Sequence, residues 1–195
     1  MTIQQDPEFV ITLQRVIEFV GTFAFALSGI RLAASKHYDW LGGFVCGIAV
    51  AIGGGTIRDV MLGLRPFWML SPIYILCTMM AQLVVIVCHN YLKRLDNTWF
   101  LFDTLGLALF NIAGIQKTLD CGFPFWVAII MGCITGAAGG VIRDVLLNEE
   151  PVIFRKEIYA MACVAGGMAY WLLSYLGVSL YVTVIVAFLM VCAIR

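Results

Sequence analysis

The residues best able to do chemistry in this sequence stand together in an otherwise apolar run. Gly53, Gly54 and Gly55 come first, and Arg58 and Asp59 follow. Each glycine costs a helix interior about 1 kcal/mol relative to alanine, so the triplet predicts a kink or a break in the helix that contains it. Backbone carbonyls released at a break are good ligands for a dehydrated cation. An arginine and an aspartate at membrane depth are expensive and by default mark function.

The motif occurs a second time, as Gly139 and Gly140 followed by Arg143 and Asp144. The two copies are 85 positions apart, and the same ungapped shift aligns many other residues. It pairs Gly21 with Gly106, Phe25 with Phe110, Gly29 with Gly114, Pro66 with Pro151 and Tyr74 with Tyr159. Chance could match several leucines in an apolar chain, but not glycines, a proline and an Arg-Asp pair in one register. The sequence therefore predicts an internal duplication.

The composition places both motifs in a membrane. Of the 195 residues, 62% are hydrophobic and only 12% are charged, and the mean hydropathy is +0.97. A helix needs about 20 mostly apolar residues to cross a hydrocarbon core of about 30 Å. Seven segments qualify, at roughly 9–30, 40–63, 69–91, 99–117, 124–147, 152–174 and 177–194. The sequence therefore predicts an all-α polytopic membrane protein, a single membrane domain over residues 1–195 without a soluble catalytic domain.

The duplication covers three spans in each copy, residues 9–91 and residues 99–174. Because three is an odd number, the second copy must enter the membrane from the opposite face. Such inverted repeats have a pseudo-two-fold axis in the membrane plane, and transport proteins built in this way bind near the midplane between the copies. The seventh span, residues 177–194, has no counterpart and is expected to pack against lipid or a neighbouring subunit.

The basic residues that flank the spans predict the orientation of the chain. One side of the seven-span threading would carry Arg31, Lys36, Lys93, Arg94, Arg155, Lys156 and Arg195, and the other side Arg58, Arg65 and Lys117. The positive-inside rule assigns the larger set to the cytoplasm, which predicts an external N-terminus and a cytoplasmic C-terminus. The formal net charge of zero gives no support for nucleic acid binding.

No motif in the chain predicts catalysis or a bound metal. HExxH, GxSxG and paired mid-span aspartates are absent from the sequence. The seven cysteines form no CxxC pair, and neither histidine has a ligand partner four residues on. We therefore expect neither an enzyme nor a resident metal or cofactor.

Small residues extend the motif glycines into stripes with a spacing of four residues. The second span carries Gly43, Gly47, Ala51 and Gly55, and the fifth span carries Ala128, Gly132, Gly136 and Gly140. Such stripes let helix backbones approach closely in lipid, where packing drives association. Close packing is therefore an alternative to an ion site, although the charged pair that follows both glycine groups favours a functional role.

The partners of the charged residues are only partly predictable. Arg58 and Asp59 are adjacent, so they point in different directions on a helix and each needs another partner. Glu18 follows Arg15 by three residues, which predicts an interfacial ion pair, and the repeat partner of Glu18 is Asp103. An arginine that faced a narrow path would oppose cations. Whether the motif arginines face such a path or anchor the helices stays open.

The doubled motif, Gly53 to Val60 and Gly139 to Val145, together with the three-plus-three-plus-one plan, resembles the bacterial branch of the trimeric intracellular cation (TRIC) channel family, also catalogued by its glycine transporter domain. The resemblance covers about residues 9 to 195. It implies a homotrimer in the bacterial inner membrane, in which each subunit has its own pore for potassium and other monovalent cations, framed by glycine-bent second and fifth spans. In one departure, Ala138 stands at the position of Gly53, so the fifth span is expected to bend less.

Two functions stay open from the sequence. The first is a passive cation channel, in which small polar side chains and helix carbonyls replace ion hydration and apolar residues close the pore. The candidate lining or gate residues are Phe25, Ser28, Phe110, Asn111 and Thr135. The second is a secondary transporter of a small neutral solute such as glycine, because inverted repeats and broken helices suit a carrier equally well.

Overall fold

A computed structural model describes residues 7–88, 98–155 and 158–195 of the chain, and these residues form helices and turns without any strand. The helices are α1 (Pro7–Ser35), α2 (Trp40–Met61), the 3-10 turn η1 (Phe67–Met69), α3 (Ile73–Val87), α5 (Thr98–Asp120), α6 (Phe125–Leu146), α7 (Val152–Arg155), α8 (Ile158–Tyr175) and α9 (Leu180–Ile194). The predicted all-helical fold class is confirmed.

Four of the described helices are long and apolar enough to cross a membrane. They are Thr12–Ser35 within α1, α2, α5 and α6. The helices α3 and α9 are apolar but have only 15 residues each. The four long helices match the predicted first, second, fourth and fifth spans, which are the spans that carry both glycine-Arg-Asp motifs and most of the candidate polar residues.

The predicted third span begins too early. In the segment 69–91 the α-helix starts only at Ile73, after Pro72, because proline has no backbone N–H and is suited to the start of a helix rather than its interior. The segment 152–174 contains α7 and α8, and residues 156 and 157 between them lie outside the described residues. Residues 89–91, Lys93, Arg94 and Lys156 lie outside the described residues.

The helices α2 and α6 end in the same way at points 85 residues apart. Gly63 and Asn148 adopt left-handed backbone conformations, with φ angles of 71° and 54°. The N–H of the next residue donates at 2.8 Å to the carbonyl of Asp59 in one case and of Asp144 in the other. A left-handed residue after the last turn is a common helix stop, and glycine and asparagine adopt this conformation most readily.

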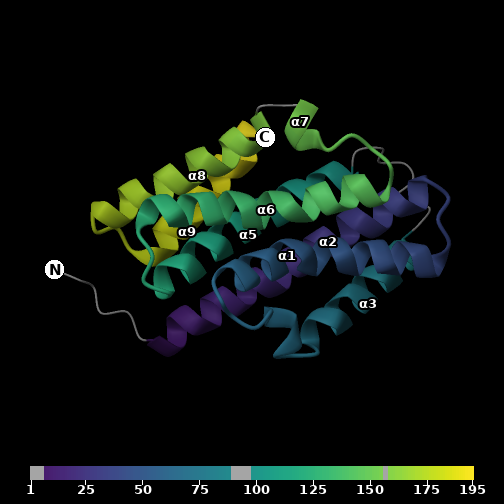
Figure 1. Cartoon of the computed structure of the whole chain (residues 1–195), viewed down its shortest axis with the longest axis horizontal. Coiled ribbons are helices and arrows are strands. Elements are labelled where there is room, and N and C mark those ends of the chain that lie inside the picture. Colours follow the sequence, from purple (N-terminus) through teal and green to yellow (C-terminus); the bar gives the residue numbers. More distant parts are fainter. Residues whose placement is uncertain (1–6, 89–97, 156–157) are drawn as a thin grey trace.

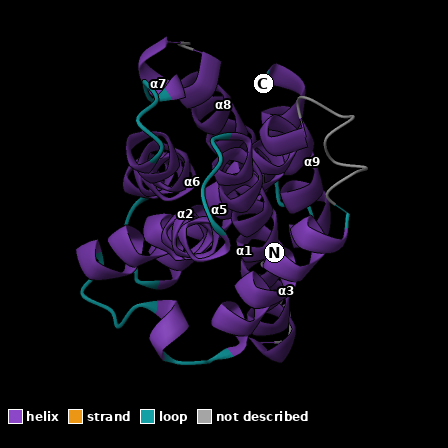
Figure 2. Cartoon of the chain, turned by 90° about the vertical axis from the view of Figure 1, so that its right-hand side faces the viewer, coloured by secondary structure: helices purple, strands orange, loops and turns teal. Residues whose placement is uncertain are grey.

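The four long helices form the centre of the molecule. α1 packs against α2 and α5, and α6 packs against α2 and α5. Figure 1 shows α3 beside α1 and α2 at one side of this bundle, and α8 and α9 at the other side over α5 and α6. Figure 2 shows the same layers from the end of the helices. Each motif helix is therefore part of the centre and also contacts a peripheral helix of its own copy, α3 for α2 and α8 for α6.

The helices α2 and α6 cross where two motif glycines meet. A Cβ atom on Gly54 would collide with the backbone carbonyl of Thr135, and a Cβ atom on Gly139 would lie 2.8 Å from the carbonyl of Val50. Val50 and Thr135 are themselves 85 residues apart, so the two contacts are reciprocal. Only residues without a side chain let the backbones approach this closely.

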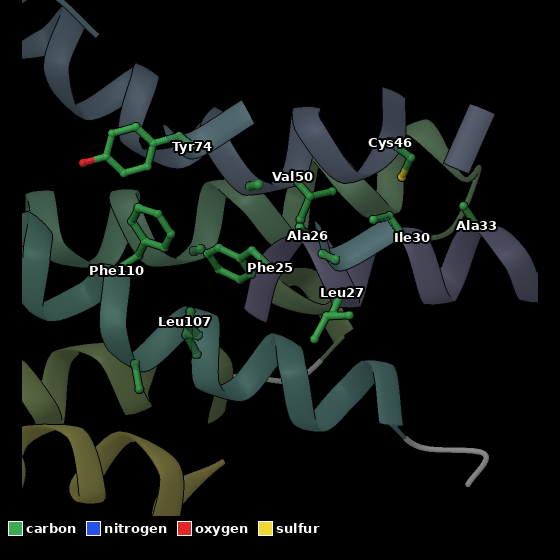
Figure 3. Close-up of a cluster of buried hydrophobic side chains, with 14 of the residues drawn as sticks. Phe25, Ala26, Leu27, Ile30, Ala33, Cys46, Val50, Tyr74, Leu107 and Phe110 are labelled. Carbon is green, nitrogen blue, oxygen red and sulfur yellow. The ribbon is translucent and has the colours of Figure 1, made fainter. Parts of the chain in front are cut away.

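A second reciprocal contact lies between α1 and α5. The rings of Phe25 and Phe110 stack with centroids 5.3 Å apart and planes 15° apart, and Figure 3 shows them side by side in the buried core. A Cβ on Gly21 would lie 3.1 Å from the Phe110 ring, and one on Gly106 would collide with the Phe25 ring. Each phenylalanine therefore packs over the glycine of the opposite copy.

The sequence predicted a kink or a break at the glycine triplet, and the break is wrong. α2 is one uninterrupted α-helix from Trp40 to Met61, and α6 is uninterrupted from Phe125 to Leu146. In a packed bundle, most helix stability comes from tertiary contacts rather than from intrinsic propensity. The close crossing at Gly54 and Gly139 supplies such contacts, so these two glycines serve helix packing, although they lie one position before the stripe residues Gly55 and Gly140.

Candidate functional site

The motif Arg-Asp pair of α2 belongs to a buried group that we call the first charge cluster, Glu18, Arg58, Asp59 and Lys117. Arg58 is fully buried, and its guanidinium donates to Asp59 Oδ1 at 2.8 Å and to Glu18 Oε1 at 2.9 Å. The Lys117 ammonium lies 3.0 Å from Asp59 Oδ1 and 3.9 Å from Glu18 Oε1. Two carboxylates and two cations make the cluster formally neutral, as buried charges require.

Phe67 and Tyr74, which follow α2 in the chain, hold the first cluster in place. The backbone N–H of Phe67 donates to Asp59 Oδ2 at 2.8 Å, and the Phe67 ring lies 5.6 Å from the Arg58 guanidinium carbon. The Tyr74 hydroxyl donates to Glu18 Oε2 at 3.2 Å. The cluster therefore ties α1, α2 and α5 to the chain that leads into α3.

The Arg-Asp pair of α6 forms the second charge cluster, Asp103, Arg143, Asp144 and Arg195. Arg143 is fully buried and donates to Asp103 Oδ1 at 2.5 Å and to Asp144 Oδ1 at 2.7 Å. It also donates to the Ser28 hydroxyl at 2.8 Å. Arg195 donates to Asp103 Oδ2. This cluster is also formally neutral and links α1, α5 and α6 to the end of α9.

The second cluster is supported like the first. The backbone N–H of Val152 donates to Asp144 Oδ2 at 3.0 Å, as Phe67 does to Asp59, and Val152 is 85 residues after Phe67. The Trp99 ring lies 5.0 Å from the Arg143 guanidinium carbon. The Tyr159 ring lies 4.2 Å from that of Arg195. The carboxylates, the motif arginines and the supporting backbone groups of the two clusters are thus related by the same 85-residue shift.

Two expectations about how the charged residues pair need correction. Adjacent Arg58 and Asp59 do pair with each other, because the long arginine side chain reaches the Asp59 carboxylate. Each also has the further partner that was expected, Glu18 for Arg58 and Lys117 for Asp59. Glu18 pairs with Arg58 of α2, and a bond to Arg15 is not among its contacts in the described residues. Sequence spacing along one helix therefore misses ion pairs that form between helices.

The remaining motif glycines lie against side chains rather than open space. A Cβ on Gly53 would collide with Ile142, and one on Gly55 would collide with Phe67. A Cβ on Gly140 would collide with the Tyr159 hydroxyl. These glycines therefore make room for the groups that surround the charge clusters.

The other candidate residues are buried at different places. Ser28 joins the second cluster, whereas Phe25 and Phe110 stack in the core. The Thr135 hydroxyl donates to the Met131 carbonyl of its own helix at 2.5 Å. Asn111 is fully buried, and neither amide atom has a hydrogen-bond partner among the described residues. The structure thus brings one of the five into contact with a motif arginine.

A pocket of about 720 Å³ opens beside the first cluster, between α1, α3 and α5. Glu18, Lys117, Tyr74 and Phe67 contribute to its walls. A second pocket, of about 700 Å³, lies at the other end of α1 near Arg31 and Gln82. Neither pocket has a residue of the second cluster in its lining.

Sequence reasoning missed four members of these networks. Tyr74 and Tyr159 fall in the 85-residue register, so the signal existed but suggested no role. Lys117 and Arg195 gave no such signal, because their repeat-related positions are Leu32 and Phe110. Each was assigned only to one side of the membrane, whereas each supplies the second cation of a cluster.

A family model described as "Glycine transporter" matches residues 15–90 and again residues 100–175, an offset of 85. The UPF0126 inner membrane protein YadS of Escherichia coli K12 is 41% identical over 157 residues, which cover 79% of this chain and 75% of YadS. The UPF0126 membrane protein YvgT of Bacillus subtilis is 32% identical over 181 residues, covering 92% and 89%. This chain belongs to the TRIC family.

Solved structures agree with the family. A TRIC trimeric intracellular cation channel orthologue from Rhodobacter sphaeroides has a TM-score of 0.88 and 31% identity, covering 93% of this chain and 94% of that one. A second solved structure, described as the structural basis for conductance through TRIC cation channels, has a TM-score of 0.80 and 33% identity. The match covers 93% of this chain and 90% of that one. With relatives named as inner membrane proteins and four long apolar helices, this TRIC-family chain is a multi-pass membrane protein.

Proposed function

We propose that this TRIC-family chain is a passive channel for monovalent cations, chiefly potassium. The observation that carries the proposal is the pair of buried, neutral charge clusters at the ends of α2 and α6, in a chain that aligns over more than 90% of its length with cation channel structures. Ionisable groups this deep in a membrane protein are retained for function. Because nearly the whole chain aligns with these channel structures, we favour the channel function over a different function for the same helix bundle.

We infer that the path runs within the subunit between two inverted repeats, residues 9–91 and 99–174, with 177–194 as an additional span. The reciprocal contacts support this layout, because a two-fold relation requires that each contact occurs twice with the copies exchanged. Gly54 with Thr135 and Gly139 with Val50 form one such pair of contacts. Three spans per copy then give opposite insertion into the membrane.

The central helices α1, α2, α5 and α6 are the walls of the proposed path. The stacked Phe25 and Phe110 rings are its closed gate, and a bend of α2 and α6 at the motif glycines opens it. Ser28, Asn111 and Thr135 line it. Arg58 and Arg143 are neutralised by their own clusters. They therefore anchor the helix ends and do not oppose cations.

We also base proposals for the oligomeric state and the cellular location on these relatives. The Rhodobacter sphaeroides structure is described as a trimeric channel, so we propose a homotrimer with one path per subunit. The relatives named as inner membrane proteins suggest the bacterial inner membrane. The distribution of basic residues supports an external N-terminus and a cytoplasmic C-terminus.

A glycine carrier is the second candidate, and the description of the matching family model favours it. Reconstitution into liposomes separates the two functions. For a channel, we expect a potassium flux that follows the electrochemical gradient and is the same with and without glycine. Saturable uptake of labelled glycine without ion conductance would contradict the channel and establish the carrier.

A further inference from the structure

The guanidinium groups of the two motif arginines are not equally satisfied. Arg143 donates from Nε and from both terminal nitrogens, and its Nη1 bonds to the Ser28 hydroxyl and to Asp103. Arg58 donates from Nε and Nη2. Its Nη1 is buried and has no hydrogen-bond partner among the described residues. A buried guanidinium nitrogen without a partner is costly, so Arg58 is the less firmly held of the two related arginines.

One side chain accounts for the difference between the arginines. The counterpart of Ser28 in the 85-residue register is Ala113, whose methyl group cannot accept a hydrogen bond. Ser28 reaches Arg143 from α1 to α6, and the corresponding helices of the opposite copies, α5 and α2, also contact each other. A serine at position 113 would therefore stand beside the Arg58 guanidinium. The first cluster lacks the acceptor that the second cluster has at this place.

The surroundings of the first cluster are also more open than those of the second. The side chain of Glu18 is 11% exposed, whereas that of its counterpart Asp103 is fully buried. Ala113 and Glu18 both line the pocket of about 720 Å³. At the ends of the motif helices, Leu62 is partly exposed, whereas its counterpart Leu147 is buried. Local opening takes place where buried contacts are few and polar groups meet solvent, and these conditions occur at the end of α2.

We propose that Ser28 and Ala113 decide which motif helix moves, so that the end of α2 opens while the end of α6 stays fixed. The meaning of this opening for transport rests on the proposed channel, in which bends of α2 and α6 open the path. Ser28 acts here as a positioning residue, because it works through Arg143. When the end of α2 opens, water from the adjoining pocket supplies the missing acceptor to Arg58 Nη1, which offsets part of the cost of the lost contacts.

Amide hydrogen exchange of the folded protein in lipid nanodiscs tests the difference at two matched positions. The N–H groups of Leu62 and Leu147 donate to the carbonyls of Arg58 and Arg143, both at 3.0 Å. The two amides therefore report on the opening of the two helix ends. In the wild type we expect the Leu62 amide to have the lower protection factor.

Exchange of the two side chains between the copies should reverse this order. Ala113→Ser adds an acceptor beside Arg58 and should slow exchange of the Leu62 amide about tenfold, because a hydrogen bond to a charged group is worth at least that factor. Ser28→Ala should speed exchange of the Leu147 amide by a similar factor. The double variant should therefore have its less protected amide at the end of α6.

Ala113→Cys is the matched control, because a thiol resembles a hydroxyl in shape but is a weak acceptor, and it should leave the Leu62 amide close to the wild type. In bilayers, Ala113→Ser should also lower the open probability, which a general gain in stability would not do. The exchange experiment needs no ion flux, so it can fail while the channel proposal stands, and the reverse also holds. Unchanged exchange of the Leu62 amide in Ala113→Ser, or failure of that variant to fold, would overturn the proposal.

Discussion

The motif arginines are the residues whose substitution we expect to cost the most free energy of unfolding. Arg58 and Arg143 are fully buried, and each is bonded to two carboxylates of its cluster. Buried ion pairs contribute little net stability relative to apolar residues, but removal of one partner leaves a charge that nothing compensates. The clusters therefore fix the positions of helix ends more than they raise stability.

Substitution of Arg58 should be severely destabilising. Arg58→Met leaves Glu18 and Asp59 with Lys117 alone, and we expect a loss of about 3–5 kcal/mol in the free energy of unfolding. Denaturant titration in detergent measures it. Arg65→Met is the control, because Arg65 is exposed in the turn after α2, and it should change little. An Arg58→Met protein as stable as this control would contradict the role of the cluster.

The repeat-related tyrosines should respond unequally to loss of the hydroxyl. Tyr74→Phe removes the hydrogen bond to Glu18 and should cost about 0.5–1.5 kcal/mol. Tyr159→Phe removes a hydroxyl without a partner in the described residues, so it should be neutral or slightly stabilising. The same denaturant titration compares the two. Equal losses would mean that Tyr159 has a partner of similar strength.

At the residue scale, the sequence identified the charged residues but not all of their partners. The 85-residue register located Arg58, Asp59 and their counterparts. It did not suggest that Lys117 and Arg195 complete the clusters, because these residues come from positions that the duplication does not relate. Contacts between distant helices depend on packing, which one sequence does not specify.

At the element scale, the crossing of α2 and α6 depends on two glycines. Their low helix propensity predicted a break, whereas the structure keeps both helices continuous and places each glycine against a carbonyl of the other helix. The small-residue stripes predicted close approach, which Gly136 makes with the Leu107 carbonyl of α5, whereas the two crossing glycines lie outside the stripes. Propensity failed here because it describes an isolated helix, and tertiary contacts override it.

Addition of one methyl group at the crossing should separate the helices. Gly54→Ala places a Cβ against the Thr135 carbonyl, so it should lower the unfolding midpoint and potassium flux. Gly43→Ala in the same helix is the matched control. Its nearest neighbour would be Gln82 Oε1 at 3.8 Å, an ordinary contact, so the better propensity of alanine should leave it neutral or slightly stabilised. If Gly54→Ala behaves like Gly43→Ala, the crossing is not close enough to matter.

At the scale of the whole molecule, the all-helical class and the matched ends of α2 and α6 follow from the sequence. The last helix was also predicted, at residues 177–194, but the contact of its end with the second cluster was not. α9 has no repeat counterpart, yet Arg195 at its end enters the second cluster. The pairing of α8 with α9 and the central place of α1, α2, α5 and α6 needed the structure.

The proposed inversion makes a direct prediction about the two sides of the membrane. Arg65 and Glu150 are exposed and lie 85 residues apart, after α2 and α6. In intact cells a membrane-impermeant maleimide should label Arg65→Cys, whereas it should label Glu150→Cys only after permeabilisation. Both are made with Cys121→Ser, because Cys121 is exposed. Labelling of both from the same side would exclude inverted repeats.

The central claim, a passive path for monovalent cations, is tested most directly by the reversal potential of the reconstituted protein in a planar bilayer under a potassium chloride gradient. We predict single-channel currents that reverse close to the equilibrium potential of potassium and are unchanged by glycine. Reversal near the equilibrium potential of chloride, or no current from folded protein that takes up glycine, would contradict the claim.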